Sequence, residues 1–167
     1  MFREISPYEI NGNTFKMIDK DWMLITAAKD GTPNSMTASW GCLGILWNKP
    51  IAICFVRPQR YTYEFCEEAD TLSLSFFDPA WRDALKLCGT KSGRDTDKYA
   101  ATGLTPVFDQ KTPYLAEART VLLCKKLYVD DLKKQNFLDP ALLKNYPIDD
   151  FHRVYICEIT KVLKQED

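Results

Sequence analysis

The sequence predicts a mainly β protein, a closed β-barrel decorated with short helices. Three observations lead to this prediction: about six or seven segments have the composition or the two-residue alternation of strands, readable turns join neighbouring segments in antiparallel order, and helical spacing is confined to short pieces. No repeat, linker or low-complexity segment interrupts the 167 residues, a length typical of one domain. Residues 1–167 are therefore predicted to form a single domain.

The predicted strands alternate with turns and breaks along the whole chain. They cover residues 22–28, 34–40, 45–47, 51–56, 71–77, 120–129 and 152–162. The pair Asp30-Gly31 predicts a hairpin turn between the first two, and residues 48–50 are expected to break the chain before the next run. That run, 51–56, is apolar enough to predict burial on both faces. Residues 105–114 contain two prolines and are expected to form a loop.

Start and stop signals define the predicted helices. They cover residues 13–20, 61–69, 79–88, 97–101 and 140–143. Asp78-Pro79 and Asp139-Pro140 each supply an N-cap aspartate and a first-turn proline, which are typical helix starts. Gly89 and Gly103 are expected to end two of the helices. Residues 89–95, with two glycines and two cations, are expected to form a flexible basic loop.

Composition argues against several classes of protein. Lys plus Arg total 22 and Asp plus Glu total 23, so the net charge of -1 gives no general attraction for nucleic acid or a membrane surface. The N-terminus lacks an apolar signal region and no run could span a bilayer, which predicts a cytoplasmic protein without a membrane partner. The six cysteines include no Cys-x-x-Cys pair, so we expect reduced thiols and no metal.

Hydrolytic chemistry has little support in the sequence. His152 is the only histidine, and no nucleophile elbow accompanies it. The aspartates occupy turn and cap positions rather than forming a catalytic pair. His152 is therefore interpreted as structural, and no catalytic side chain is assigned.

Residues 34–40 combine amide and hydroxyl groups with bulky apolar side chains. In an extended strand Met36, Ala38 and Trp40 share one face, while Ser35, Thr37 and Ser39 share the other. Such a surface suits a flat ligand with a polar edge. An ordinary half-buried barrel strand would also have this pattern.

Two basic segments are candidate anion sites. Arg57, Arg60 and Thr62 lie where a strand ends and a helix begins, a position that suits phosphate. The alternative is that both arginines are solvated and Thr62 caps its helix. Residues 89–95 are the second candidate; they lack Walker spacing, and such a loop taken alone is more often a mobile surface turn. A candidate phosphate site and a surface for a flat ligand, taken together, suggest a mononucleotide such as FMN.

Three segments, in their order and spacing, resemble the flavin reductase-like FMN-binding split-barrel family. They are residues 34–41, 57–62 and 92–98. The resemblance is clearest over residues 22–103, and no family motif matches residues 130–150. It implies an FMN-binding split barrel of Greek-key type and a homodimer with FMN near the interface. The first segment would line the isoalloxazine, the second would hold the phosphate and the third would add contacts. The implied cofactor-binding residues are Asn34, Met36, Thr37, Ser39, Trp40, Arg57, Arg60, Tyr61, Thr62, Ser92, Arg94 and Lys98.

The resemblance also implies an activity, that of an NAD(P)H:flavin oxidoreductase. Hydride transfer from a nicotinamide to FMN needs close stacking and a tuned flavin rather than a protein base, which agrees with a site poor in titrating residues. Two alternatives remain. One is a flavoredoxin-like electron-transfer flavoprotein without its own nicotinamide site, and the other is a non-catalytic small-ligand barrel.

Overall fold

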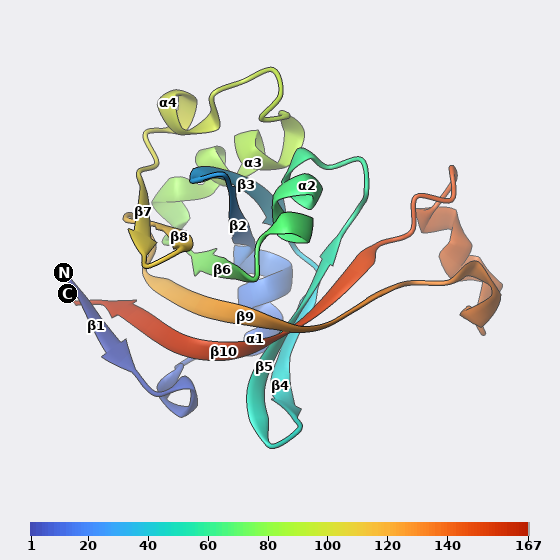
Figure 1. Cartoon of the computed structure of the whole chain (residues 1–167), viewed down its shortest axis with the longest axis horizontal. Coiled ribbons are helices and arrows are strands. Elements are labelled where there is room, and N and C mark those ends of the chain that lie inside the picture. The colour runs from blue at the N-terminus through green and yellow to red at the C-terminus, as the bar shows by residue number, and fades with distance from the viewer. Residues whose placement is uncertain (167) are drawn as a thin grey trace.

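The computed structural model describes residues 1–166, and its main element is one antiparallel sheet (Figure 1). Its strands are β1 (Phe2–Ile5), β2 (Met23–Lys29), β3 (Thr32–Ala38), β4 (Gly41–Leu46), β5 (Lys49–Val56), β6 (Thr71–Phe76), β9 (Thr120–Asp131) and β10 (Arg153–Gln165). They pair in the order β3-β2-β6-β9-β10-β5-β4, with β1 alongside β10. A separate hairpin consists of β7 (Pro106–Asp109) and β8 (Thr112–Leu115).

The sheet curves into a barrel that is split rather than closed. Its end strands, β3 and β4, follow one another in the chain, and within residues 1–166 no ladder joins them. Such a split leaves the corner between β3 and β4 accessible from outside. The mainly β barrel predicted from the sequence is confirmed, and the expectation of full closure is corrected.

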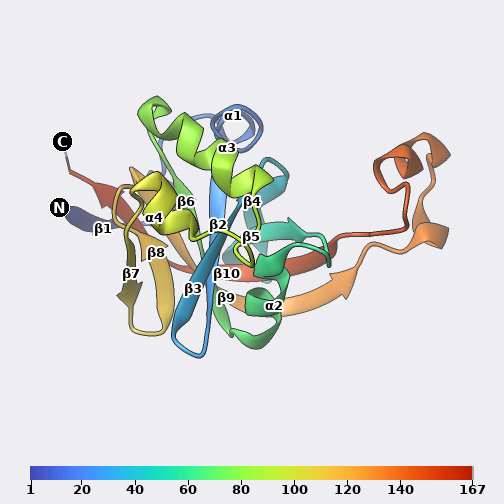
Figure 2. The ribbon, with the colours of Figure 1, turned by 90° about the horizontal axis from the view of Figure 1, so that it is seen from above.

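Short helices cover the barrel. They are α1 (Thr14–Lys16), α2 (Tyr61–Glu68), α3 (Arg82–Thr90) and α4 (Lys98–Thr102), and a π-helical turn, Met17–Asp21, extends α1. The view from above shows α3 and α4 over one side of the sheet (Figure 2), and α2 packs against β2 and β3. Apolar side chains fill both the barrel interior, around Phe65 and Tyr155, and the layer under α3, around Leu85 and Leu115. No described helix has the length and apolarity needed to cross a bilayer.

Several local predictions are confirmed. Asp30 and Gly31, with φ of 48° and 75°, form the hairpin turn between β2 and β3. Asp97 caps α4 through the backbone N–H groups of Tyr99 and Ala100, and Gly103 follows that helix in the left-handed conformation.

Other predictions are wrong for identifiable reasons. Gly89 does not end α3, which continues to Thr90; a Cβ at Gly89 would lie 3.3 Å from the Thr37 Cβ, so this glycine permits close packing on β3. Residues 105–114 include the β7–β8 hairpin rather than only a loop, and a two-stranded sheet tolerates its prolines because every strand is an edge. The first strand, β1, was not predicted.

The strands near the split also differ from their prediction. β3 ends at Ala38, so Ser39 and Trp40 belong to the corner that follows rather than to the strand. The chain reverses between β4 and β5 at Trp47 and Asn48, where φ is 52° and 57°, and β5 already begins at Lys49. β5 is buried on alternate residues, not on both faces, because Ile53 and Phe55 point away from the barrel interior.

Residues 132–151 form an arm that projects from the barrel between β9 and β10 (Figures 1 and 2). Two 3₁₀ turns, Lys134–Asn136 and Pro140–Asn145, shape it, and the second contains the predicted short helix. The rings of Phe137, Tyr146 and Phe151 pack together with centroids 4.8 to 5.8 Å apart. This aromatic cluster gives the arm a small core of its own.

Candidate ligand-binding site

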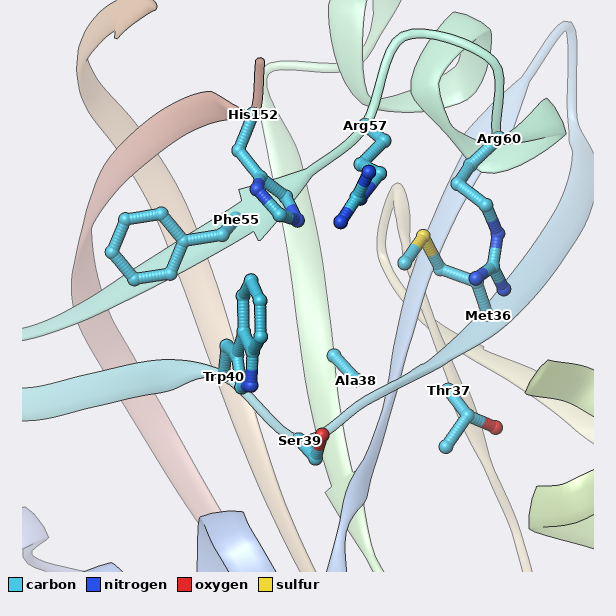
Figure 3. Close-up of a pocket in the computed structure, with 9 residues that line it drawn as sticks. All are labelled: Met36, Thr37, Ala38, Ser39, Trp40, Phe55, Arg57, Arg60 and His152. Atoms are coloured by element: carbon cyan, nitrogen blue, oxygen red, sulfur yellow. The ribbon is translucent and has the colours of Figure 1, made fainter. Parts of the chain in front are cut away.

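A cavity of about 190 Å³ opens at the split between β3 and β4. Its walls come from the end of β3, the corner after it, the end of β5, the start of α2 and the residue that follows the arm. The residues that line it are Met36, Thr37, Ala38, Ser39, Trp40, Phe55, Arg57, Arg60 and His152. Figure 3 shows the imidazole of His152 near the indole of Trp40, with Arg57 beside it and Arg60 further along.

The rings at one end of this cavity form an aromatic wall. The centroids of Trp40 and His152 are 5.2 Å apart, and Phe55 meets His152 edge to face at 6.2 Å. Trp40 is 47% exposed, an unusual state for so large an apolar side chain. The wall therefore offers a flat aromatic surface to a ligand.

A second cavity, of about 590 Å³, lies between the start of β3, α2 and the loop before α4. Four predicted cofactor-binding residues line it: Asn34, Tyr61, Arg94 and Lys98. Asn34 is buried and donates from Nδ2 to Thr62 Oγ1 at 2.7 Å, which ties β3 to α2. A Cβ at Gly93 would come within 2.3 Å of Asn34 Oδ1, so only glycine lets the loop approach this closely. Ser92 lines neither cavity; its hydroxyl accepts from the Arg94 N–H at 3.2 Å.

Arg60, which lines the first cavity, and Lys98, which lines the second, meet at one backbone oxygen. Arg60 Nη2 and Lys98 Nζ donate to the same backbone oxygen, that of Cys88, at 3.3 and 3.1 Å, and Lys98 also donates to the oxygen of Ser35 at 2.8 Å. Neither cation has a carboxylate partner within residues 1–166. Burial lowers the pKa of Arg60 and lowers that of Lys98 to about 8. Buried cations are normally paired, so this position suits an anion.

Arg57 and Arg94 are in the opposite situation. Arg57 donates to Asp150 Oδ2 at 2.5 Å and to the backbone oxygen of Asn145 at 2.9 Å, both in the arm. Arg94 pairs with Glu64 and lies over the ring of Tyr61. Internal carboxylates thus already compensate both charges. No local sequence signal indicates the pairing of Arg57, because its partners lie about ninety residues further along the chain.

His152 is buried and lies between the arm and the first cavity. Its Nδ1 is 2.7 Å from the hydroxyl of Tyr146. Burial, with a smaller effect of the nearby Arg57 charge, lowers the pKa of His152 to about 4, so the ring is neutral at pH 7. The sequence analysis interpreted His152 as structural, and only its position just before the last strand could have suggested that it faces the site.

Together the barrel, its split and the cavities define a split-barrel ligand-binding protein. The profile of the flavin reductase like domain matches residues 18–167, so the chain belongs to the flavin reductase-like family. A search of curated protein sequences found no match.

Similar solved structures share this fold. One is an FMN-binding domain of a flavin reductases-like enzyme from Shewanella baltica OS155, with a TM-score of 0.71, 17% identity, and coverage of 98% of this chain and 77% of the other. Another is the flavoredoxin of Desulfovibrio vulgaris (Miyazaki F), with a TM-score of 0.68, 23% identity, and coverage of 87% and 69%. A third is the NADH:FAD oxidoreductase of Streptomyces globisporus C-1027, with a TM-score of 0.64, 14% identity, and coverage of 87% and 74%. At these identities the likeness concerns the fold.

Proposed function

We propose that the protein is an FMN-binding NAD(P)H:flavin oxidoreductase, folded as a single domain and acting as a cytoplasmic homodimer. The observation that carries the proposal is the pair of half-buried Arg60 and buried Lys98, which have no carboxylate partner within residues 1–166, next to an aromatic wall. A flat ring joined to a dianionic phosphate matches both parts. When bound, FMN supplies a ring that accepts a hydride from a nicotinamide.

The chain's own residues would bind and orient this cofactor. Arg60 and Lys98 would hold the phosphate, since charged hydrogen bonds are the strong ones. Met36, Thr37, Ser39 and Trp40 would line the ring in the first cavity, and Asn34, Tyr61 and Thr62 would shape the passage between ring and phosphate. Three predicted residues would affect the cofactor only indirectly, because each already bonds to another protein group: Ser92, Arg57 and Arg94.

A homodimer would complete the site. The first cavity, about 190 Å³, is smaller than the roughly 300 to 1,000 Å³ of a typical ligand pocket and leaves Trp40 exposed. The β4–β5 hairpin and the outer part of β9 expose large apolar side chains: Ile45, Leu46, Trp47, Leu127, Tyr128 and Val129. A second copy placed on this surface would bury it and cover the open side of the cavity.

The free thiols of all six cysteines support a reducing compartment, hence the cytoplasm. The alternative function is flavoredoxin-like electron transfer without a nicotinamide site. The similarity of the fold to that of a flavoredoxin supports this alternative.

An absorption spectrum tests the proposal. The purified protein, mixed with FMN and freed of excess cofactor, should keep a flavin spectrum that NADH or NADPH bleaches without oxygen. Retained FMN that is reduced by dithionite but by neither nicotinamide would favour the electron-transfer alternative. Failure to retain or bind FMN would refute the proposal.

A further inference from the structure

The arm contacts two side chains that line the first cavity, Arg57 and His152. Tyr146, from the 3₁₀ turn of the arm, places its hydroxyl 2.7 Å from Nδ1 of His152, and both side chains are buried, with 7% of each exposed. Since His152 also lines the first cavity, this bond connects the arm to the candidate site.

The direction of this hydrogen bond follows from the available partners. The Tyr146 hydroxyl has no other hydrogen-bond partner within residues 1–166, so a buried proton would lack an acceptor if His152 were the donor. Burial raises the pKa of Tyr146, which keeps the hydroxyl protonated. Tyr146 is therefore the donor and Nδ1 the acceptor. In the neutral ring, the proton then lies on Nε2.

The proton on Nε2 faces the first cavity. Nε2 has no protein partner within residues 1–166, yet it is not one of the fully buried unpaired atoms, which are Ser75 Oγ and Asp150 Oδ1. It is therefore accessible, and the cavity is the open space that this ring lines.

The surrounding groups keep the ring uncharged. Arg57, at the end of β5, opposes a second positive charge, and Asp150 in the arm, which favours one, is already bound to Arg57. The other groups packed on the ring are the uncharged rings of Trp40, Phe55 and Tyr146.

We propose that Tyr146 is a positioning residue, which holds His152 as a neutral donor with its proton on Nε2, directed at an acceptor atom of the ligand in the cavity. The acceptor is a carbonyl oxygen or an imine nitrogen, and both FMN and nicotinamide carry such atoms. The identity of the ligand rests on the proposed function; the state of the ring does not.

The single histidine makes the test direct, because only one imidazole contributes to the nitrogen NMR signals of the ¹⁵N-labelled full-length protein. Without ligand, Nδ1 should be pyridine-like and Nε2 pyrrole-like, and neither should titrate between roughly pH 5 and 8. In Tyr146→Phe the tautomers should mix, so that the two signals approach each other. Tyr8→Phe, an exposed tyrosine outside the arm, is the matched control and should match the parent.

A pyrrole-like Nδ1 in the parent protein would overturn the proposal without any variant. Signals of a folded Tyr146→Phe protein identical to those of the parent would do the same. Ligand additions then identify the acceptor: a shift of the Nε2 signal with FMN alone places it on the flavin, and a shift only after NAD⁺ joins bound FMN places it on the nicotinamide. Bound ligands that leave Nε2 unmoved would refute its role as a donor. A protein that binds no FMN but shows the expected tautomer would refute the proposed function only.

Discussion

The cations at the two ends of the site differ in what surrounds them. Arg57, at the arm, has Asp150 and a backbone oxygen as partners, whereas Arg60 and Lys98, beneath α3, share one backbone oxygen and have no carboxylate within the described residues. The sequence placed Arg57 and Arg60 in one motif, three residues apart. Whether a cation can pair with a ligand therefore depends on which protein groups the fold already places next to it.

The largest expected effect comes from reversing an unpaired charge. Arg60→Glu should weaken FMN binding about a hundred-fold or more, and Lys98→Met about ten-fold to a hundred-fold, because each loses a charged hydrogen bond to phosphate. Riboflavin, which lacks the phosphate, should be affected far less. Arg94→Gln, at an arginine already paired with Glu64, is the matched control. Titration of the apo-protein of the parent and of the three variants by flavin fluorescence measures these affinities. Equal losses for FMN and riboflavin would place the phosphate elsewhere.

The pH dependence of FMN binding should follow Lys98. In the free protein its pKa is about 8, and a bound phosphate should raise it towards the ordinary 10.5, because an opposite charge favours the ammonium form. Below pH 8 the lysine is charged in both states. Above it, binding takes up a proton, so affinity should fall by roughly ten-fold per pH unit until the pKa of the bound form is reached. The same titration in Lys98→Met should lack this slope, and a slope that persists would exclude Lys98 as its source.

A paired arginine should affect stability more than cofactor affinity. Arg57→Gln should lower the urea midpoint and change FMN affinity by only about three-fold, within the range of surface electrostatics. Asp150→Asn should lower the midpoint similarly, and the double variant should lower it less than the two single effects combined, since they remove the same ion pair. A hundred-fold loss of FMN in Arg57→Gln, with the midpoint unchanged, would contradict the comparison.

The smallest effect concerns the uncharged wall. Trp40→Ala should shift the visible spectrum of bound FMN and weaken its binding by about ten-fold at most, the scale of one aromatic contact. Phe15→Ala, at an exposed aromatic side chain of α1 that lines neither cavity, serves as a control for general loss of aromatic surface. An unchanged spectrum with a loosened fold would make Trp40 a core residue instead.

The fold was predictable where its signals are local. Asp30-Gly31 defines its hairpin, and Asp97 and Gly103 bound α4, because cap and turn preferences act over a few residues. β7 and β8 are short strands whose prolines resemble loop residues, so their pairing could not be read from composition.

The candidate site was predictable as a set of residue types but not as a set of roles. Asn34 and Trp40 lie at cavities as their chemistry suggested. The meeting of Arg60 and Lys98 at the Cys88 oxygen depends on how α3 lies on β3, which no spacing shows. The pairing of Arg57 with Asp150 depends on the return of the chain through the arm.

The arm also affects how the sequence of this protein can diverge during evolution. It is a loop inserted between β9 and β10, two strands that pair along most of their length whatever the arm contains. Lengthening such a loop costs little, on the order of 0.6 kcal/mol for each doubling. Insertions and deletions there can therefore accumulate without loss of the barrel. One end of the arm leads directly into His152, so each such change can alter the aromatic end of the cavity. Within residues 1–166, Arg60 and Lys98, under α3, make no hydrogen bond or ion pair with the arm and would stay as they are.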